Sequence, residues 1–229
     1  MVGKCRRPIT NGFSFVTRLR LFRTFLWALT VYVALTALSL SILSIYGQTI
    51  IPFYRWELGR IASSYRVQTI TFDQSGMDPL FKVRARRLIV SGPYAMLYDV
   101  SSIAWAMAGL QHFVLVLLIP LAWPGLKLRQ RLLSLPVAIP FLIAFEWADT
   151  PWSIVSGLDL GSVSVTGGPI PSATIWTEIL NAGGRLALSL AGGLLACGGG
   201  YFIEQSLSPS RKTSKRSRAS RRLGAARAK

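Results

Sequence analysis

The sequence has few charged residues, and acidic residues are the scarcest. Only 15% of its 229 residues are charged and 51% are hydrophobic, whereas about 25% are charged in a typical soluble domain. Nine acidic residues face 26 basic ones, which gives a net charge of +17. This composition excludes an ordinary water-soluble domain and indicates a membrane protein. The bases lie mostly outside the apolar runs, so topology explains them better than nucleic-acid binding.

Cysteine and the signature motifs of enzymes are also scarce or absent. The two cysteines, Cys5 and Cys197, are too few for a zinc site. A disulfide is not expected, because Cys5 lies among terminal bases and Cys197 in an apolar run. The sequence contains no Walker loop, no H-E-x-x-H, no G-x-S-x-G and no C-x-x-C. We therefore expect no cofactor, no metal and no common catalytic site.

Four apolar runs predict four transmembrane helices. Residues 24–46 carry no charged side chain, and a helix of that length crosses a hydrocarbon core of about 30 Å. The runs 100–123, 132–148 and 175–203 follow, the second of these being short and interrupted by two prolines. A cleaved signal peptide is the alternative for the first run, but its apolar core exceeds the usual ~7 to 15 residues.

Basic residues beside the spans predict the orientation, since Lys and Arg near span ends are retained in the cytoplasm. The amino-terminal segment 1–23, the connection 124–131 and the tail 204–229 are all basic. Four spans place these three segments on one side. We therefore expect an inner (plasma) membrane protein with both termini cytoplasmic and with the segments 47–99 and 149–174 outside.

The first outer segment, 47–99, shows a strand pattern. The runs 67–72 and 81–90 are rich in β-branched residues and flank a polar linker, which predicts a β-hairpin. The preceding stretch, 53–65, mixes aromatic and charged residues, as a helix on the membrane surface does. The second outer segment, 149–174, is rich in Gly, Ser and Pro and is expected to be irregular.

The tail 204–229 is predicted to be disordered, because it has too little apolar content to offset its ordering entropy. Its nine bases are expected to contact anionic lipid head groups, at about 1 kcal/mol each near the surface. No aromatic residue among them offers a stacking platform for nucleic acid. The predicted fold is thus mainly α: a four-span transmembrane bundle with a small extracytoplasmic β-hairpin and a disordered basic tail.

Arg185 is the most informative ionisable residue within a predicted span, because a guanidinium there is almost always paired or turned toward water. Glu178 lies two turns away on the same helix, and Glu146 and Asp149 lie at the end of the preceding span. One interpretation is a structural ion pair between two helices. The other is a polar outer cleft, able to hold a peptide or a polar head group, formed by Glu146, Asp149, Glu178, Asn181 and Arg185.

His112 and Cys197 are the remaining reactive groups within the spans. We interpret His112 as hydrogen-bonded between helices, because no acidic partner is evident at its depth. Cys197 is interpreted as a packing residue. About 18 Å of helix separates Cys197 from Arg185, and the three groups are not expected to share one site.

The last span also predicts a packing face of small residues. They recur at steps of four positions: Gly192, Ala196 and Gly200. Side chains of this size let helices approach closely. The face packs either within the bundle or against a partner subunit.

The order of these features resembles a known family. The resemblance rests on the first span ending near Ile51-Pro52, the outer hairpin, the segment 93–98, the Trp123-Pro124-Gly125 turn, the close of the third span at residues 145–149 and the Gly-rich last span. Together they resemble the exosortase-associated integral membrane proteins of bacteria. The resemblance implies an inner-membrane accessory to a sorting system, in which a separate multi-span cysteine peptidase processes secreted proteins. It implies no catalytic residue, and the basic tail lies outside it.

Three hypotheses follow. The first is a non-enzymatic accessory protein that contacts membrane lipids and a multi-span peptidase or its secreted substrate. The second is a membrane enzyme or transporter component that acts through the cleft around Arg185. The third is a binder of cytoplasmic anions through the tail. The sequence favours the first.

The topology is tested by reporter fusions after Gly76 and after Lys229. Four spans place the two fusion points on opposite sides of the membrane, so only the first reporter should be active in the periplasm. Activity of both reporters on the same side would contradict this topology.

Overall fold

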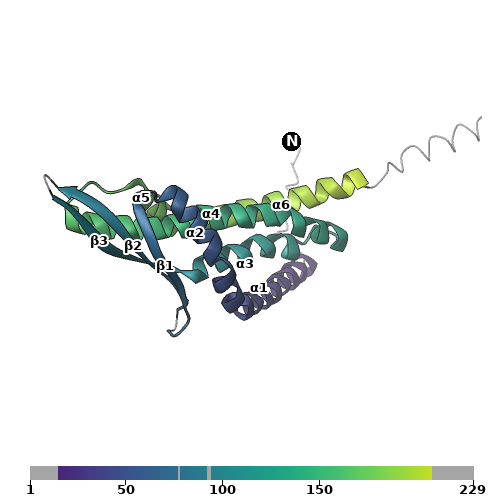
Figure 1. Cartoon of the computed structure of the whole chain (residues 1–229). Helices are drawn as coiled ribbons and strands as arrows, with labels where there is room; N and C mark the ends of the chain where they lie inside the picture. Colours follow the sequence, from purple (N-terminus) through teal and green to yellow (C-terminus); the bar gives the residue numbers. More distant parts are fainter. Residues whose placement is uncertain (1–14, 77, 92–93, 208–229) are drawn as a thin grey trace, which may run out of the picture.

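The chain is elongated, with a bundle of helices at one end and a three-stranded sheet at the other (Figure 1). A computed structural model describes residues 15–76, 78–91 and 94–207. The helices are α1 (Phe15–Thr49), α2 (Ile51–Ile61), α3 (Ala106–Ala122), α4 (Leu128–Thr166), α5 (Ser172–Ile179) and α6 (Arg185–Leu207), with the π-helical turn η1 (Leu180–Gly184) between the last two. The predicted tail lies outside the described residues from 208 onward, and 204–207 belong to α6 instead.

Within the described residues, three helical segments are long and apolar enough to cross a membrane: Arg20–Thr49, Leu128–Val165 and Ser172–Leu207. The remaining apolar helix, α3, has 17 residues and is therefore about 26 Å long. The second span was predicted to begin at residue 100, but residues 100–105 belong to a strand. The apolar run is divided between a strand and a helix, which hydropathy alone does not distinguish.

α4 is the largest departure from prediction. The third span was expected to end at residue 148 and to be followed by an irregular segment, yet one helix of 39 residues runs from Leu128 to Thr166. The Gly and Ser of that segment serve close packing: a Cβ on Gly157 would lie 2.2 Å from the Ser102 Oγ of the sheet. The residue that caps the carboxyl end of the helix is Gly167, whose φ of 68° is left-handed.

The sheet contains the predicted hairpin and one additional strand. Strands β1 (Tyr65–Asp73), β2 (Leu80–Ser91) and β3 (Tyr94–Trp105) are antiparallel and lie in that order. The third strand was missed because it lies within the predicted lead into the second span and the start of that span. Its residues from 100 to 105 alternate between buried and exposed side chains, which is the period of a strand.

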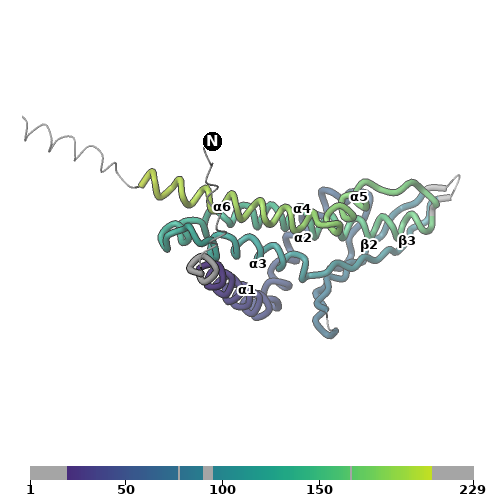
Figure 2. Tube along the Cα trace, turned by 180° about the vertical axis from the view of Figure 1, so that it is seen from behind, coloured from purple at the N-terminus to yellow at the C-terminus, as the bar shows by residue number. Residues whose placement is uncertain are grey.

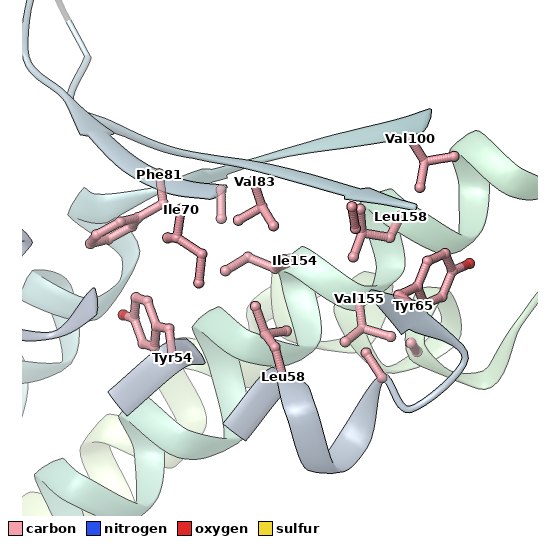
Figure 3. Close-up of a cluster of buried hydrophobic side chains, with 14 of the residues drawn as sticks. Tyr54, Leu58, Tyr65, Ile70, Phe81, Val83, Val100, Ile154, Val155 and Leu158 are labelled. Atoms are coloured by element: carbon pink, nitrogen blue, oxygen red, sulfur yellow. The ribbon is translucent and has the colours of Figure 1, made fainter. Parts of the chain in front are cut away.

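One face of the sheet packs on α2 and α4 and forms the main core (Figure 3). Phe81 and Val83 of β2 are fully buried and lie against α2 and α4. The helices contribute Tyr54 and Leu58 from α2, and Ile154, Val155 and Leu158 from α4. Burial of each large apolar side chain stabilises the fold by about 1.5–3 kcal/mol. The sheet is therefore attached to α4 along much of its length.

α2 is shorter and more buried than the predicted surface helix over 53–65. It ends at Ile61, and Tyr65 already belongs to β1. Its Glu57 is 1% exposed, and neither carboxyl oxygen has a hydrogen-bond partner among the described residues. Burial raises the pKa of Glu57 to about 7, although the nearby Arg60 opposes the shift.

α6 lies along α3 and α4 (Figure 2), and its small-residue face is turned toward them. Ala196 is fully buried. A Cβ on Gly192 would lie 2.5 Å from the Phe145 ring of α4, and one on Gly200 would lie 2.2 Å from Ser134 Oγ. Of the two interpretations left open by the sequence, the structure shows contact between helices of the same chain.

Glu57 gives the fold a pH dependence. The folded state holds a proton on this carboxyl up to about pH 7, whereas the unfolded chain releases it near pH 4.5. The free energy of unfolding should therefore fall as the pH rises from about 4.5 to 7. Glu57→Gln should flatten this slope and raise the melting temperature at pH 8, as measured by circular dichroism in detergent. Parallel pH profiles for the variant and the parent would contradict the assignment.

Candidate functional site: a polar network at Asp149

Asp149 of α4 lies at the centre of a buried polar network that joins three helices. Its side chain is 1% exposed. Arg185 of α6 donates from Nε to Asp149 Oδ2 at 2.5 Å and from Nη2 to Asp149 Oδ1 at 2.7 Å. The Nε2 of His112 in α3 lies 3.0 Å from Oδ2. One carboxylate thus binds side chains from two other helices.

The backbone just before Arg185 departs from an ordinary helix. The π-helical turn η1 precedes it, and Gly183 within that turn has a φ of 114°. A residue with a side chain is strained at such an angle. A Cβ on the next residue, Gly184, would lie 2.7 Å from the carbonyl oxygen of Ile179. The two glycines therefore allow the kink from which α6 begins with Arg185 directed at α4.

Every nitrogen of the Arg185 guanidinium has an acceptor within the chain. Nη1 donates to Asn181 Oδ1, and Nη2 also donates to Ser153 Oγ at 3.3 Å. Ser153 in turn donates to Asp149 Oδ1 at 3.3 Å. A charged group in an apolar helix is costly unless it is paired in this way. The network is consistent with an internal ion pair that stabilises the bundle.

The proton positions follow from the donors available. The Asp149 carboxylate only accepts, so His112 Nε2 carries a hydrogen. His112 Nδ1 lies 2.7 Å from Ser189 Oγ, which lies 2.7 Å from the carbonyl oxygen of Arg185. If Ser189 donates to that carbonyl, both ring nitrogens donate and His112 is a cation. If Ser189 donates to Nδ1 instead, the ring is neutral.

Ser189, His112 and Asp149 form a chain of the same three residue types as a hydrolase triad. Ser189 is 0% exposed and His112 1%. A substrate carbonyl has no approach to a hydroxyl buried between helices, and a nucleophile must touch the reacting atom. The geometry therefore fits helix association better than acyl transfer.

The structure brings together three of the five residues of the predicted cleft: Asp149, Asn181 and Arg185. Glu146 lies elsewhere, where the hydroxyl of Tyr54 donates to it. Glu178 is exposed and forms no ion pair among the described residues. The same part of the chain has no cluster of three or more metal-ligating side chains.

The expectation that His112 has no acidic partner was wrong. It assumed a helix that begins at residue 100, which puts His112 at mid-depth. α3 begins at Ala106, so His112 lies in its second turn, close to the sheet and level with Asp149. Ser189 was also missed, although it follows Arg185 by four positions and hence shares its helix face.

A cavity of about 270 Å³ lies beside the network. Trp105 is among its apolar lining residues, and its polar lining comes from six residues: Asp149, Thr150, Ser153, Thr177, Asn181 and Arg185. Ligand pockets usually range from about 300 to 1,000 Å³. The cavity is small, and four of the polar side chains that line it already bind one another.

Removing either partner of the Arg185–Asp149 ion pair should destabilise the bundle. Arg185→Leu and Asp149→Asn should each lower the free energy of unfolding by about 3–5 kcal/mol, because each strands a buried polar partner. The double variant should lose less than the sum, with a coupling energy of about 0.5–3 kcal/mol. Arg185→Leu with Glu178→Gln serves as the matched control and should be additive. Unfolding in detergent measures all variants, and additivity for the Asp149 pair would contradict the network.

Comparison with protein-family models, with curated proteins and with solved structures found no match. The resemblance to exosortase-associated proteins therefore rests on the sequence layout.

Proposed function

We propose that this chain is a multi-span inner-membrane accessory protein that presents its sheet to a protein partner and performs no catalysis of its own. The proposed topology has four spans, formed by α1, α3, α4 and the continuous α5–α6 segment. Three of these segments have the length and hydropathy for the role. The turn between α3 and α4 and the end of α6 lie at the end of the bundle away from the sheet (Figure 2). This arrangement supports cytoplasmic basic segments and an external sheet.

The open face of the sheet carries the proposal. Side chains of β2 alternate, so Phe81, Val83 and Ala85 are buried while the intervening side chains are exposed. The exposed side chains include Lys82, Arg84 and Arg86. Helices α2 and α4 cover the opposite face, which fixes the orientation of this one. The result is a row of three bases on a rigid surface.

Charge on this face exceeds what the sheet itself neutralises. Lys82 pairs with Asp73 at 2.5 Å, and this contact holds the pKa of Asp73 well below its usual range. Arg86 pairs with Asp99 at 2.7 Å. Arg84, between them, has no ion pair among the described residues. The face therefore attracts acidic groups.

Apolar side chains share the open face with the bases. Four of them are between 56% and 67% exposed: Leu88, Leu97, Ile103 and Trp105. The register places Leu88 opposite Leu97 and Lys82 opposite Ile103. Apolar side chains gathered next to charged ones are typical of a surface that binds protein. We infer a partner segment that carries acidic and apolar side chains together.

The partner that the family resemblance implies is a multi-span cysteine peptidase or its secreted substrate. The open face offers such a partner a docking surface outside the bilayer. Membrane lipids contact the spans, and anionic head groups are the proposed contacts of the basic tail. The satisfied network at Asp149 supports a structural role for the buried charges.

A second candidate function is that of a membrane enzyme or transporter component. The observation in its favour is the cavity of about 270 Å³ beside Arg185. The guanidinium there already binds Asn181 and Ser153, which leaves it less available to a ligand. We therefore rank it second.

The docking face is tested by charge reversal. Arg84→Glu should lower the amount of co-expressed multi-span peptidase that co-purifies with this chain at least tenfold, because it places an acid where the partner presents acids. Arg55→Glu in α2 is the matched control, since Arg55 is an exposed base outside the sheet, and it should have no effect. An equal yield with Arg84→Glu and the parent, or an equal loss with both variants, would contradict the docking face.

A further inference from the structure

A larger cavity lies among α1, α2, α3 and α4. Its volume is about 420 Å³, which is within the range of about 300–1,000 Å³ for ligand pockets. Its lining is almost entirely apolar, and Glu146 and Tyr46 are the exceptions. Ile143 lines the cavity and is 59% exposed, so the cavity opens to the outside of the bundle, where lipid lies in the proposed topology.

The polar groups of this cavity have apolar residues on both sides, since Ile50 and Phe53 line it next to α2 and other apolar residues line it toward the middle of the bundle. Tyr46 is in the last turn of α1, Glu146 is midway along α4, and Gly109 is in the first turn of α3. One turn farther from the sheet, the same helices contribute Ile42, Leu142 and Phe113. A molecule that matches this lining has one polar group beside Tyr46 and Glu146 and an apolar chain toward the middle of the bundle.

Glu146 has no cation to balance it. Its carboxylate accepts a hydrogen bond from the Tyr54 hydroxyl, which lies 3.1 Å from the Tyr46 hydroxyl. Among the residues that the structure describes, no Lys, Arg or His forms an ion pair with it, and Arg185 binds Asp149 instead. Acidic side chains within apolar helices normally pair with a cation. A ligand with a positively charged group would supply the cation that Glu146 lacks.

A glycine in α3 lets the two polar side chains of the cavity approach the helix backbone. A Cβ on Gly109 would lie 2.4 Å from Glu146 Oε2 and 2.5 Å from the Tyr46 hydroxyl oxygen. Both polar atoms thus approach the α3 backbone closely, at a position where any side chain would displace them. The space around the carboxylate depends on this residue.

We propose that this cavity binds a membrane amphiphile with one alkyl chain and a protonated amine head group. The ammonium pairs with the Glu146 carboxylate and donates to the Tyr46 hydroxyl oxygen, and the alkyl chain lies against Ile42, Phe113 and Leu142. Charge complementarity excludes fatty acids, whose carboxylates would face a carboxylate. The site is separate from the Asp149 network and from the open face of the sheet.

The experiment uses the full chain in a non-ionic detergent and a dodecylamine that carries a photoreactive diazirine. The amine should label the protein, and unlabelled dodecylamine should compete at least tenfold better than dodecanol or dodecanoate. Glu146→Gln keeps the shape of the site and the acceptor for Tyr54 but removes the charge, so labelling should fall at least tenfold. Undiminished labelling of this variant, or equal competition by dodecanol, would overturn the proposal.

A second pair of variants keeps Glu146 intact. Ile42→Trp should fill the apolar end and lower labelling at least tenfold. Ile45→Trp is its matched control, because Ile45 lies on the same helix and is 68% exposed, away from the cavity. Should Glu146→Gln fail to fold, this pair decides: equal labelling of the two tryptophan variants overturns the proposal.

Discussion

The arrangement of the bundle depends on one carboxylate. Asp149 is buried and ionised between two nitrogen-bearing partners, Arg185 and His112, which come from different helices. Leaving such a group unpaired costs several kcal/mol, so the helices are held at the depth where all three side chains meet. That depth places His112 near the start of α3 and Arg185 at the start of α6. The kink at Gly183 and the length of α4 are local features that make this meeting possible.

α4 connects the helical bundle with the sheet. Its first half packs against α3 and α6, and its second half lies beneath the sheet (Figure 1). The sheet consequently has one buried face and one open face of fixed orientation. Three separate polar features result: the satisfied network at Asp149, the open basic face of the sheet, and the cavity beside Glu146. Only the last two have polar groups that the chain leaves without an opposite charge.

Sequence patterns predicted the apolar runs, the hairpin and Asp149 as one of three candidate partners of Arg185, because hydropathy, strand alternation and the cost of a buried charge are local signals. They did not predict β3, because its apolar alternation merges with the helix that follows. They also separated His112 from Asp149, since that contact depends on where α3 begins. Glu146 was grouped with Arg185 because it lies one helical turn from Asp149 on the same side of α4. Its carboxylate contacts Tyr54 of α2 instead, a tertiary contact that no local pattern announces.

The protonation of His112 tests the account most directly, because it is the only histidine in the chain. Nitrogen-15 NMR of protein labelled only at histidine reports both ring nitrogens without interference. An ionised Asp149 that accepts from His112 requires a hydrogen on Nε2, so Nε2 should give a protonated shift that changes in Asp149→Asn. A neutral ring with a bare Nε2 and its hydrogen on Nδ1 would contradict the shared carboxylate.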